Sequence, residues 1–106
     1  MYIVVLVTVS SMQEAQEISA VLVEEKLAAC VNIIKGVQSL FWWEGKVDRA
    51  NEILLVIKSK KAKLAAVVKR VKSRHSYTTP EIIALPLIGG DKAYLKWIDD
   101  SIRKSR

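Results

Sequence analysis

Two segments of the chain are apolar at nearly every position. They are residues 3–7, within the segment 2–9, and residues 53–57. Uninterrupted runs of β-branched and aliphatic residues are typical of strands that are buried on both faces. Because neighbouring side chains in a strand point to opposite sides, each run predicts a strand with two apolar faces.

Two other segments show helical spacing, with apolar residues separated by three and four positions. The first begins after Ser11, which forms a capping-box pattern with Glu14, and should end near Lys26. The second follows Ser59, which we expect to be the N-cap. The apolar positions are Ala15, Ile18 and Leu22 in the first segment and Leu64, Val67, Val68 and Val71 in the second.

A β-hairpin is predicted between these two helices. Residues 29–43 alternate loosely between apolar and polar, and the Glu44-Gly45 pair that follows is a turn signal. Val47 then resumes the strand pattern, which leads into the second apolar run. Gly36 should mark a bulge or a bend in the first strand of the hairpin.

The last third of the chain predicts one more strand and a short terminal helix. Residues 81–87 read as a strand, and Pro86 places it at the edge of the sheet because proline cannot donate to a ladder. Asp91 should cap the terminal helix. The resulting order, β-α-β-β-α-β plus a C-terminal helix, predicts an α+β fold of the ferredoxin-like, split βαβ type, in which the two apolar runs are central strands.

This arrangement leaves one apolar face of the sheet without helices to cover it. Each large apolar side chain left in water forgoes roughly 1.5–3 kcal/mol of burial free energy. Exposed patches of this kind usually mark interfaces. We therefore expect a second copy of the chain to cover the face; the alternative is that the terminal helix folds under the sheet and covers it.

Length and charge narrow the classes of function. The chain has 106 residues, enough for a single domain spanning 1–106, and a formal net charge of +6. The excess lies at residues 60–74, either as a solvated helix face or as a surface for anions. Nucleic-acid binding is disfavoured because the central strands lack the aromatic residues on which bases stack. The chain has no run long enough for a membrane helix, and we expect it in the cytoplasm.

Residues that could carry chemistry are few. One Cys and one His are present, Cys30 and His75, and their spacing matches no zinc motif. Taken alone, Cys30 reads as a small buried apolar residue and His75 as a polar loop residue. Because the sequence contains no phosphate-binding glycine loop, nucleophile elbow or pair of catalytic carboxylates, an enzyme is not indicated.

Three segments nevertheless resemble the CutA divalent-cation tolerance family. They are residues 27–33 (LAACVNI), residues 42–46 (WWEGK) with Glu52 and Lys58-Ser59, and a C-terminal set that comprises His75-Ser76-Tyr77, Pro80-Glu81-Ile82 and residues 94–97. The resemblance implies a ferredoxin-like homotrimer whose hairpins reach neighbouring subunits, tolerance to copper and other divalent cations, and binding of copper. It implies no catalysis and no cofactor that folding requires.

The resemblance also assigns site residues. Cys30 and His75 are the expected metal ligands, and the other expected cleft positions are Glu52, Lys58, Tyr77, Trp43 and Trp97. Copper, whose Cu(I) form prefers soft ligands, suits a thiolate and an imidazole, but a competent site needs groups from more than one subunit. Lys58 should either favour the Cys30 thiolate or form an ion pair with Glu52.

This chain departs from the family pattern His-Pro-Tyr-Glu, because Ser76 and Thr78 stand at the proline and glutamate positions. The departure removes one expected carboxylate ligand, for which Glu81 is a candidate substitute. Two other classes of function stay open: a PII-like signalling module that binds a small anionic ligand between subunits, and a scaffold for a protein partner.

Overall fold

The computed structural model describes residues 1–103 of the chain. The elements follow the predicted order. They are β1 (Tyr2–Val9), α1 (Met12–Glu24), β2 (Cys30–Trp43), β3 (Lys46–Lys60), a 3-10 turn (Lys61–Lys63), α2 (Leu64–Arg74), β4 (Ile82–Pro86) and α3 (Lys92–Ile102).

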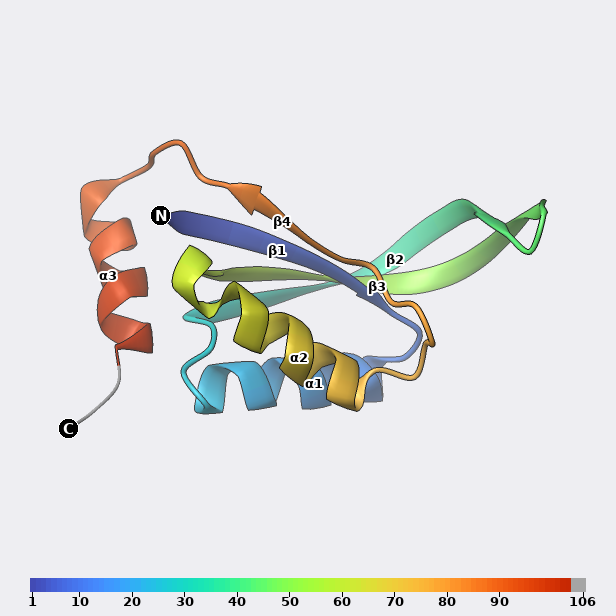
Figure 1. Cartoon of the computed structure of the whole chain (residues 1–106), viewed down its shortest axis with the longest axis horizontal. Coiled ribbons are helices and arrows are strands. Elements are labelled where there is room, and N and C mark those ends of the chain that lie inside the picture. Colours follow the sequence, from blue (N-terminus) through green and yellow to red (C-terminus); the bar gives the residue numbers. More distant parts are fainter. Residues whose placement is uncertain (104–106) are drawn as a thin grey trace.

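The four strands form one antiparallel sheet in the order β2-β3-β1-β4, with the two apolar runs in the centre as predicted. Val5 lies opposite Ile57, and Leu6 lies opposite Val56. Helices α1 and α2 pack side by side against one face, while α3 lies beyond the end of the sheet where β1 begins (Figure 1).

The core lies between the sheet and the two long helices. Alternate residues of β1 and β3 point toward it, because side chains of a strand alternate between its faces. The core side chains are almost fully buried and form one cluster: Ile3, Val5, Val7, Val9, Ala15, Ile18, Leu22, Ala28, Leu55, Ile57, Val67 and Val71. The helical spacing in the sequence therefore identified the buried faces of α1 and α2 correctly.

Only half of the predicted capping box forms at the start of α1. The hydroxyl of Ser11 accepts a hydrogen bond from the Glu14 N–H at 3.2 Å, as expected. The Glu14 carboxylate instead accepts the N–H of Ser76 at 3.2 Å, after α2. The helix ends at Glu24, close to the expected position, and Lys26 just beyond it has a positive φ of 59°.

The prediction that Ser59 caps the second helix is wrong. Ser59 is fully buried inside β3, and its hydroxyl donates to the Leu27 carbonyl at 2.7 Å. Strand alternation turns this side chain toward the core, where a hydroxyl needs a partner, and Leu27 supplies one. Helix α2 begins five residues later at Leu64, and its N-cap Lys63 makes no side-chain capping bond.

The β2–β3 hairpin extends well beyond the helices (Figure 1). Its turn has positive φ at both central residues, 50° at Glu44 and 82° at Gly45, which matches the right-handed twist of the flanking strands. A bulge shifts the register between Ile34 and Val37, and Gly36 within it has φ +78°. The sequence predicted both the turn and the bulge.

The C-terminal third also follows the prediction in outline. Strand β4 occupies the sheet edge beside β1, although it is two residues shorter than the predicted 81–87. Asp91 caps α3 by accepting the Tyr94 N–H at 3.0 Å. Helix α3 buries Ile98 and joins the sheet through a 2.6 Å ion pair between Lys60 and Asp99. No helix in residues 1–103 is long and apolar enough to cross a membrane.

The second face of the sheet stays open, because α3 does not cover it. Residues that lie opposite one another in the ladder share a face, which allows this face to be read from the register. Ile34, Ile83 and Leu85 are about half exposed there, at 45%, 52% and 50%. We call this surface the open face; its apolar residues are Val4, Leu6, Ile34, Leu54, Val56, Ile83 and Leu85.

The bulge provides a test of backbone strain. A Cβ added to Gly36 meets no atom within 4 Å, so the cost of Gly36→Ala comes from its positive φ alone. We expect a loss of about 1 kcal/mol in the free energy of unfolding, measured by denaturant titration at a fixed protein concentration. Gly89→Ala is the control, because Gly89 lacks both crowding and a positive φ. Equal stability of the two variants would contradict this account.

Candidate functional site

The only cysteine of the chain lies in a small polar cluster on the sheet. Cys30 begins β2 and lies opposite Lys58 of β3. The Lys58 ammonium is 4.0 Å from the Cys30 sulfur and donates a hydrogen bond to the Asn32 amide oxygen. The Cys30 thiol in turn lies 3.9 Å from that oxygen. Of the two positions predicted for Lys58, the structure selects the one beside the thiol.

Helix α3 brings an aromatic pair to this cluster. Burial and, next, the neighbouring Cys30 raise the pKa of the Tyr94 phenol. The ring of Tyr94 lies 5.3 Å from that of Trp97, centroid to centroid. Tyr94 was not among the predicted site residues, although its helical spacing from Trp97 was a signal that could have identified it. We call Cys30, Asn32, Lys58 and Tyr94 the thiol cluster.

His75 lies elsewhere, in the loop that follows α2. Its side chain has no exposed surface. Ring atom Nε2 lies 2.7 Å from the Thr8 carbonyl oxygen, and Nδ1 accepts the Tyr77 N–H at 3.0 Å. Because a carbonyl can only accept and a backbone N–H can only donate, the ring is neutral and carries its proton on Nε2.

Tyr77 links this loop to the hairpin. Its hydroxyl donates to the Glu52 carboxylate at 2.8 Å, and Glu52 is itself buried. Burial and then this hydrogen bond raise the pKa of Tyr77 to about 12. Glu14 approaches from α1, with a carboxylate oxygen 3.3 Å from Nδ1 of His75. We call Glu14, Glu52, His75 and Tyr77 the loop anchor.

The structure does not bring the two expected metal ligands together within one subunit. Cys30 lies opposite Lys58, whereas His75 contacts Thr8, whose ladder partner is Leu54. These partners lie four positions apart, which corresponds to about 13 Å along β3. Among the described residues, no group of three or more His, Cys, Asp or Glu side chains could hold a metal ion. A single chain therefore does not fit a metal centre at these positions.

The remaining predicted residues are also dispersed. Trp43 lies at the far end of the hairpin, away from both clusters. Glu81, the candidate substitute ligand, is exposed and forms no ion pair with any residue between 1 and 103. Of the predicted set, the structure pairs Cys30 with Lys58, and Tyr77 with both His75 and Glu52.

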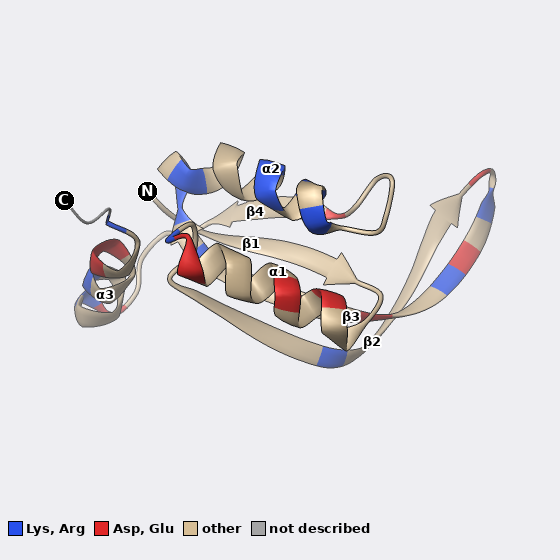
Figure 2. Ribbon diagram, turned by 90° about the horizontal axis from the view of Figure 1, so that it is seen from below, with Lys and Arg blue, Asp and Glu red and all other residues tan. Residues whose placement is uncertain are grey.

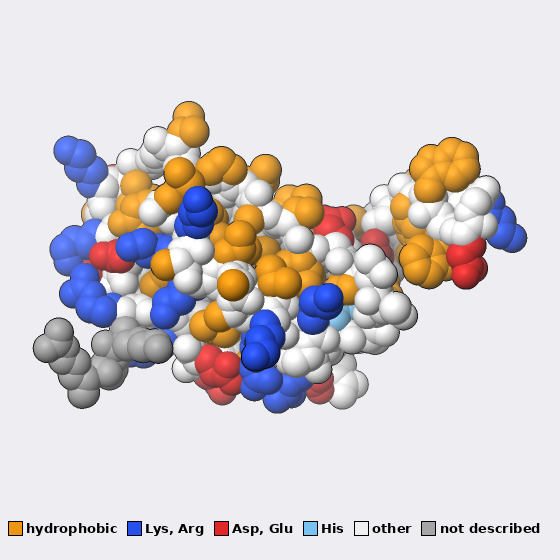
Figure 3. All heavy atoms as spheres, viewed as in Figure 1, with side chains coloured by type: hydrophobic (Ala, Val, Ile, Leu, Met, Phe, Trp, Pro, Cys, Tyr) orange, Lys and Arg blue, Asp and Glu red, His pale blue; other side chains and the backbone are white. Residues whose placement is uncertain are grey.

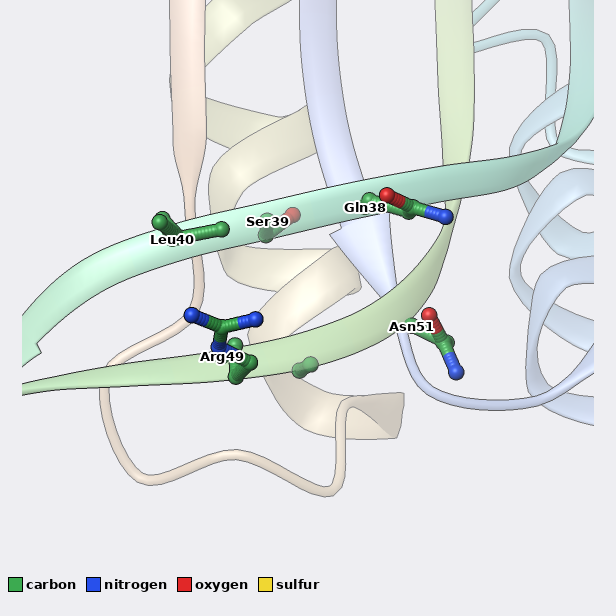
Figure 4. Close-up of a pocket in the computed structure, with 6 residues that line it drawn as sticks. Gln38, Ser39, Leu40, Arg49 and Asn51 are labelled. Atoms are coloured by element: carbon green, nitrogen blue, oxygen red, sulfur yellow. The ribbon is translucent and has the colours of Figure 1, made fainter.

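The projecting part of the hairpin is apolar and hollowed. Hydrophobic side chains gather at its far end (Figure 3), and its exposed residues are Leu40, Phe41, Trp42, Trp43 and Val47. A cavity of about 320 Å³ lies on the same ribbon, lined by Gln38, Ser39, Leu40, Arg49, Ala50 and Asn51 (Figure 4). None of the predicted site residues lines it.

The basic segment around α2 is partly neutralised (Figure 2). Arg70 forms a bidentate ion pair, at 3.0 and 2.7 Å, with Glu25, the C-cap residue of α1, and this pair lowers the pKa of the Glu25 carboxyl. Lys60 is paired with Asp99. Within the part of the chain that the structure describes, the other basic residues form no ion pair: Lys61, Lys63, Lys69, Lys72 and Arg74.

Comparison with known sequences gives one consistent result. The sequence model of the family described as CutA1 divalent ion tolerance protein matches residues 3–101. The chain is 47% identical to the divalent-cation tolerance protein CutA of Archaeoglobus fulgidus, over 91% of this chain and 93% of that protein. It is also 47% identical to a chloroplastic CutA protein of rice, over 97% of this chain but only 58% of the relative. The chain thus spans little more than half of its plant relatives.

Solved structures agree with the sequence comparison. The periplasmic divalent cation tolerance protein CutA of Archaeoglobus fulgidus superposes with a TM-score of 0.94 at 45% identity, covering 97% of this chain and all of that one. CutA1 of rice superposes with a TM-score of 0.93 at 46% identity, covering 98% of this chain and 95% of that one. The Thermus thermophilus protein superposes with a TM-score of 0.91 at 46% identity, covering 92% of this chain and 95% of that one.

Removal of the Tyr77 hydroxyl tests the loop anchor. We expect Tyr77→Phe to lower the free energy of unfolding by about 1–3 kcal/mol at neutral pH, because the buried Glu52 carboxylate loses a donor. Folding raises the pKa of the Tyr77 phenol from its ordinary 10 to about 12. The stabilisation by the Tyr77 hydroxyl is therefore complete below pH 10 and disappears as the pH rises to about 12. Urea unfolding between pH 7 and 12 measures the difference between the two proteins.

Tyr2→Phe is the matched control, because its ring keeps its place 5.5 Å from the Lys60 ammonium without the hydroxyl. We expect Tyr2→Phe to leave the stability unchanged. A Tyr77→Phe difference that stays constant through pH 12 would contradict the proposed bond.

Proposed function

Because the chain belongs to the CutA1 divalent ion tolerance family, we propose that it contributes to divalent-cation tolerance as a homotrimer of ferredoxin-like subunits. In this proposal, copper or another divalent ion binds in clefts between subunits, and the role is not catalytic. The observation that carries the proposal is the open face, an apolar sheet surface that one chain leaves uncovered.

The open face favours self-association on energetic grounds. Three of its residues are about half exposed, and covering each of them would gain about 1 kcal/mol. The projecting hairpin adds five exposed apolar residues in the same chain. Exposed apolar patches of this kind usually mark interfaces, and neighbouring copies of the chain are the partners that could cover this one.

The thiol cluster is the part of the chain that best suits a soft metal ion. Cys30 is a free cysteine and is partly exposed. The Lys58 ammonium lies 4.0 Å from this sulfur. Since one subunit offers a single soft donor here, a bound ion would complete its coordination with groups of a neighbouring subunit.

A second candidate function rests on Lys58 alone. No carboxylate of residues 1–103 pairs with its ammonium, whose partners are Asn32 and Cys30. An ammonium that has no carboxylate partner would suit a small anionic ligand such as a phosphate in a cleft between subunits, as in a PII-like signalling module. A role as a scaffold for a protein partner would need neither ligand.

We propose a reducing compartment, the cytoplasm, for this chain. The basis is the one unpaired cysteine, which a reducing environment keeps as a thiol. The related proteins include chloroplastic and periplasmic ones, so the compartment varies within the family.

The oligomer is tested by molar mass. Light scattering after size exclusion should give three times the chain mass of 11.9 kDa at micromolar concentration. We expect Leu85→Lys to weaken association at least tenfold, because the ammonium would have to be buried in the interface. Val23→Lys is the control, because Val23 is similarly exposed, at 42%, but lies on α1. If the wild-type protein has the mass of a single chain, the proposed trimer is wrong.

Copper binding is tested at the thiol cluster. Titration of Cu(I) under anaerobic conditions should show at least tenfold weaker binding to Cys30→Ser than to the wild type, because serine offers no soft donor. Met12→Leu, which removes a sulfur atom outside the cluster, should bind copper as the wild type does. Unchanged binding in Cys30→Ser would reject the cysteine role. Stabilisation by phosphate or nucleotides that Lys58→Gln abolishes would favour the second candidate function instead.

A further inference from the structure

The environment of His75 does not suit a metal ligand. To bind a metal ion, an imidazole needs a ring nitrogen whose lone pair is free. The Nε2 atom of His75 uses its proton toward the Thr8 carbonyl, and the lone pair of Nδ1 already accepts the Tyr77 N–H. Because the side chain has no exposed surface, an ion could reach it only after the loop opened.

We propose that His75 is a neutral positioning residue and not a metal ligand, and that it holds the 75–79 loop so that Tyr77 binds Glu52 at the root of the hairpin. The proposal stands on these contacts. Only the part of its test that uses copper depends on the proposed function.

Two bonds of His75 define the path of the loop. The bond to Thr8 ties the loop to the end of β1. The bond from the Tyr77 N–H to the ring closes a tight local turn, in which a side chain accepts the N–H two residues ahead, as Asn and Asp side chains do in Asx turns. The ring of Tyr77 is thereby held 4.8 Å from that of His75.

The other end of Tyr77 reaches the hairpin. Its hydroxyl binds Glu52, which lies opposite Val37, directly after the bulge in the β2–β3 ladder. The loop is therefore fixed both to β1 and to the point where the hairpin leaves the body of the fold. In this proposal, His75 influences the orientation of the hairpin through Tyr77 and Glu52, without touching the hairpin itself.

Glu14 provides a third attachment of the loop. Its carboxylate accepts the Ser76 N–H at 3.2 Å and lies 3.3 Å from Nδ1 of His75. A metal ion at Nδ1 would have to displace the Tyr77 N–H. It would thereby leave a backbone donor unpaired inside the protein.

The wild-type protein allows a direct test, because His75 is its one histidine. Nitrogen NMR of the imidazole should show the proton on Nε2 and an unprotonated Nδ1 at neutral pH. Addition of Cu(I) to saturation should leave both nitrogen signals in place while the Cys30 signals shift. A shift of either ring nitrogen on copper addition, or a proton on Nδ1, would overturn the proposal. If no signal responds to copper, the proposed function fails, and the position of the proton still decides the role of His75.

Two conservative variants separate the two bonds of the ring. Asparagine can still accept the Tyr77 N–H but is too short to reach Thr8, and glutamine can reach Thr8 but does not close the turn. We expect hydrogen exchange of the Tyr77 amide to accelerate at least tenfold in His75→Gln and in His75→Ala, and to stay near the wild-type rate in His75→Asn. Equal exchange in all three variants would contradict the positioning role.

Discussion

The sheet of this protein has two apolar faces and helices for only one of them. Strand alternation sends Val5 and Ile57 to the helices, and it sends Leu6 and Val56, their neighbours in sequence, to the other side. The same two strands therefore build both the core and the open face. The proposed association with other copies of the chain rests on this uncovered surface.

Strand β3 places the two candidate clusters. Lys58, in the thiol cluster, is the last β3 residue paired with β2, and Glu52, in the loop anchor, lies six positions before it, beside the bulge. The clusters differ in chemistry as well as in position. The thiol cluster contains a partly exposed sulfur beside an ammonium, whereas the loop anchor consists of buried groups whose hydrogen bonds are made within the chain. This contrast supports the proposals that a soft metal ion binds at the first cluster and that the second cluster has a structural role.

The sequence predicted what depends on near neighbours. The Ser11 cap, the Glu44-Gly45 turn, the Gly36 bulge and the edge position of β4 follow from residues within a few positions. Ser59 was misassigned because a serine before a helical pattern looks like an N-cap, while its burial depends on a strand register that local sequence does not reveal. The loop anchor could not be predicted as a geometry, since Glu14 and Ser76 are 62 residues apart. The family resemblance placed Tyr77 and Glu52 in the same cleft, but it did not predict the hydrogen bond between them.

The departure at Ser76 has a physical consequence for the site. A proline at this position, as in the family pattern, has no N–H to donate. Serine supplies one, and the Glu14 carboxylate accepts it. In this chain the Glu14 carboxylate is thus bonded to the loop after α2, and it lies 3.3 Å from Nδ1 of the His75 ring. The serine that departs from the family pattern thus supplies a hydrogen bond between the loop and α1, and this bond supports the structural role that we propose for the loop anchor.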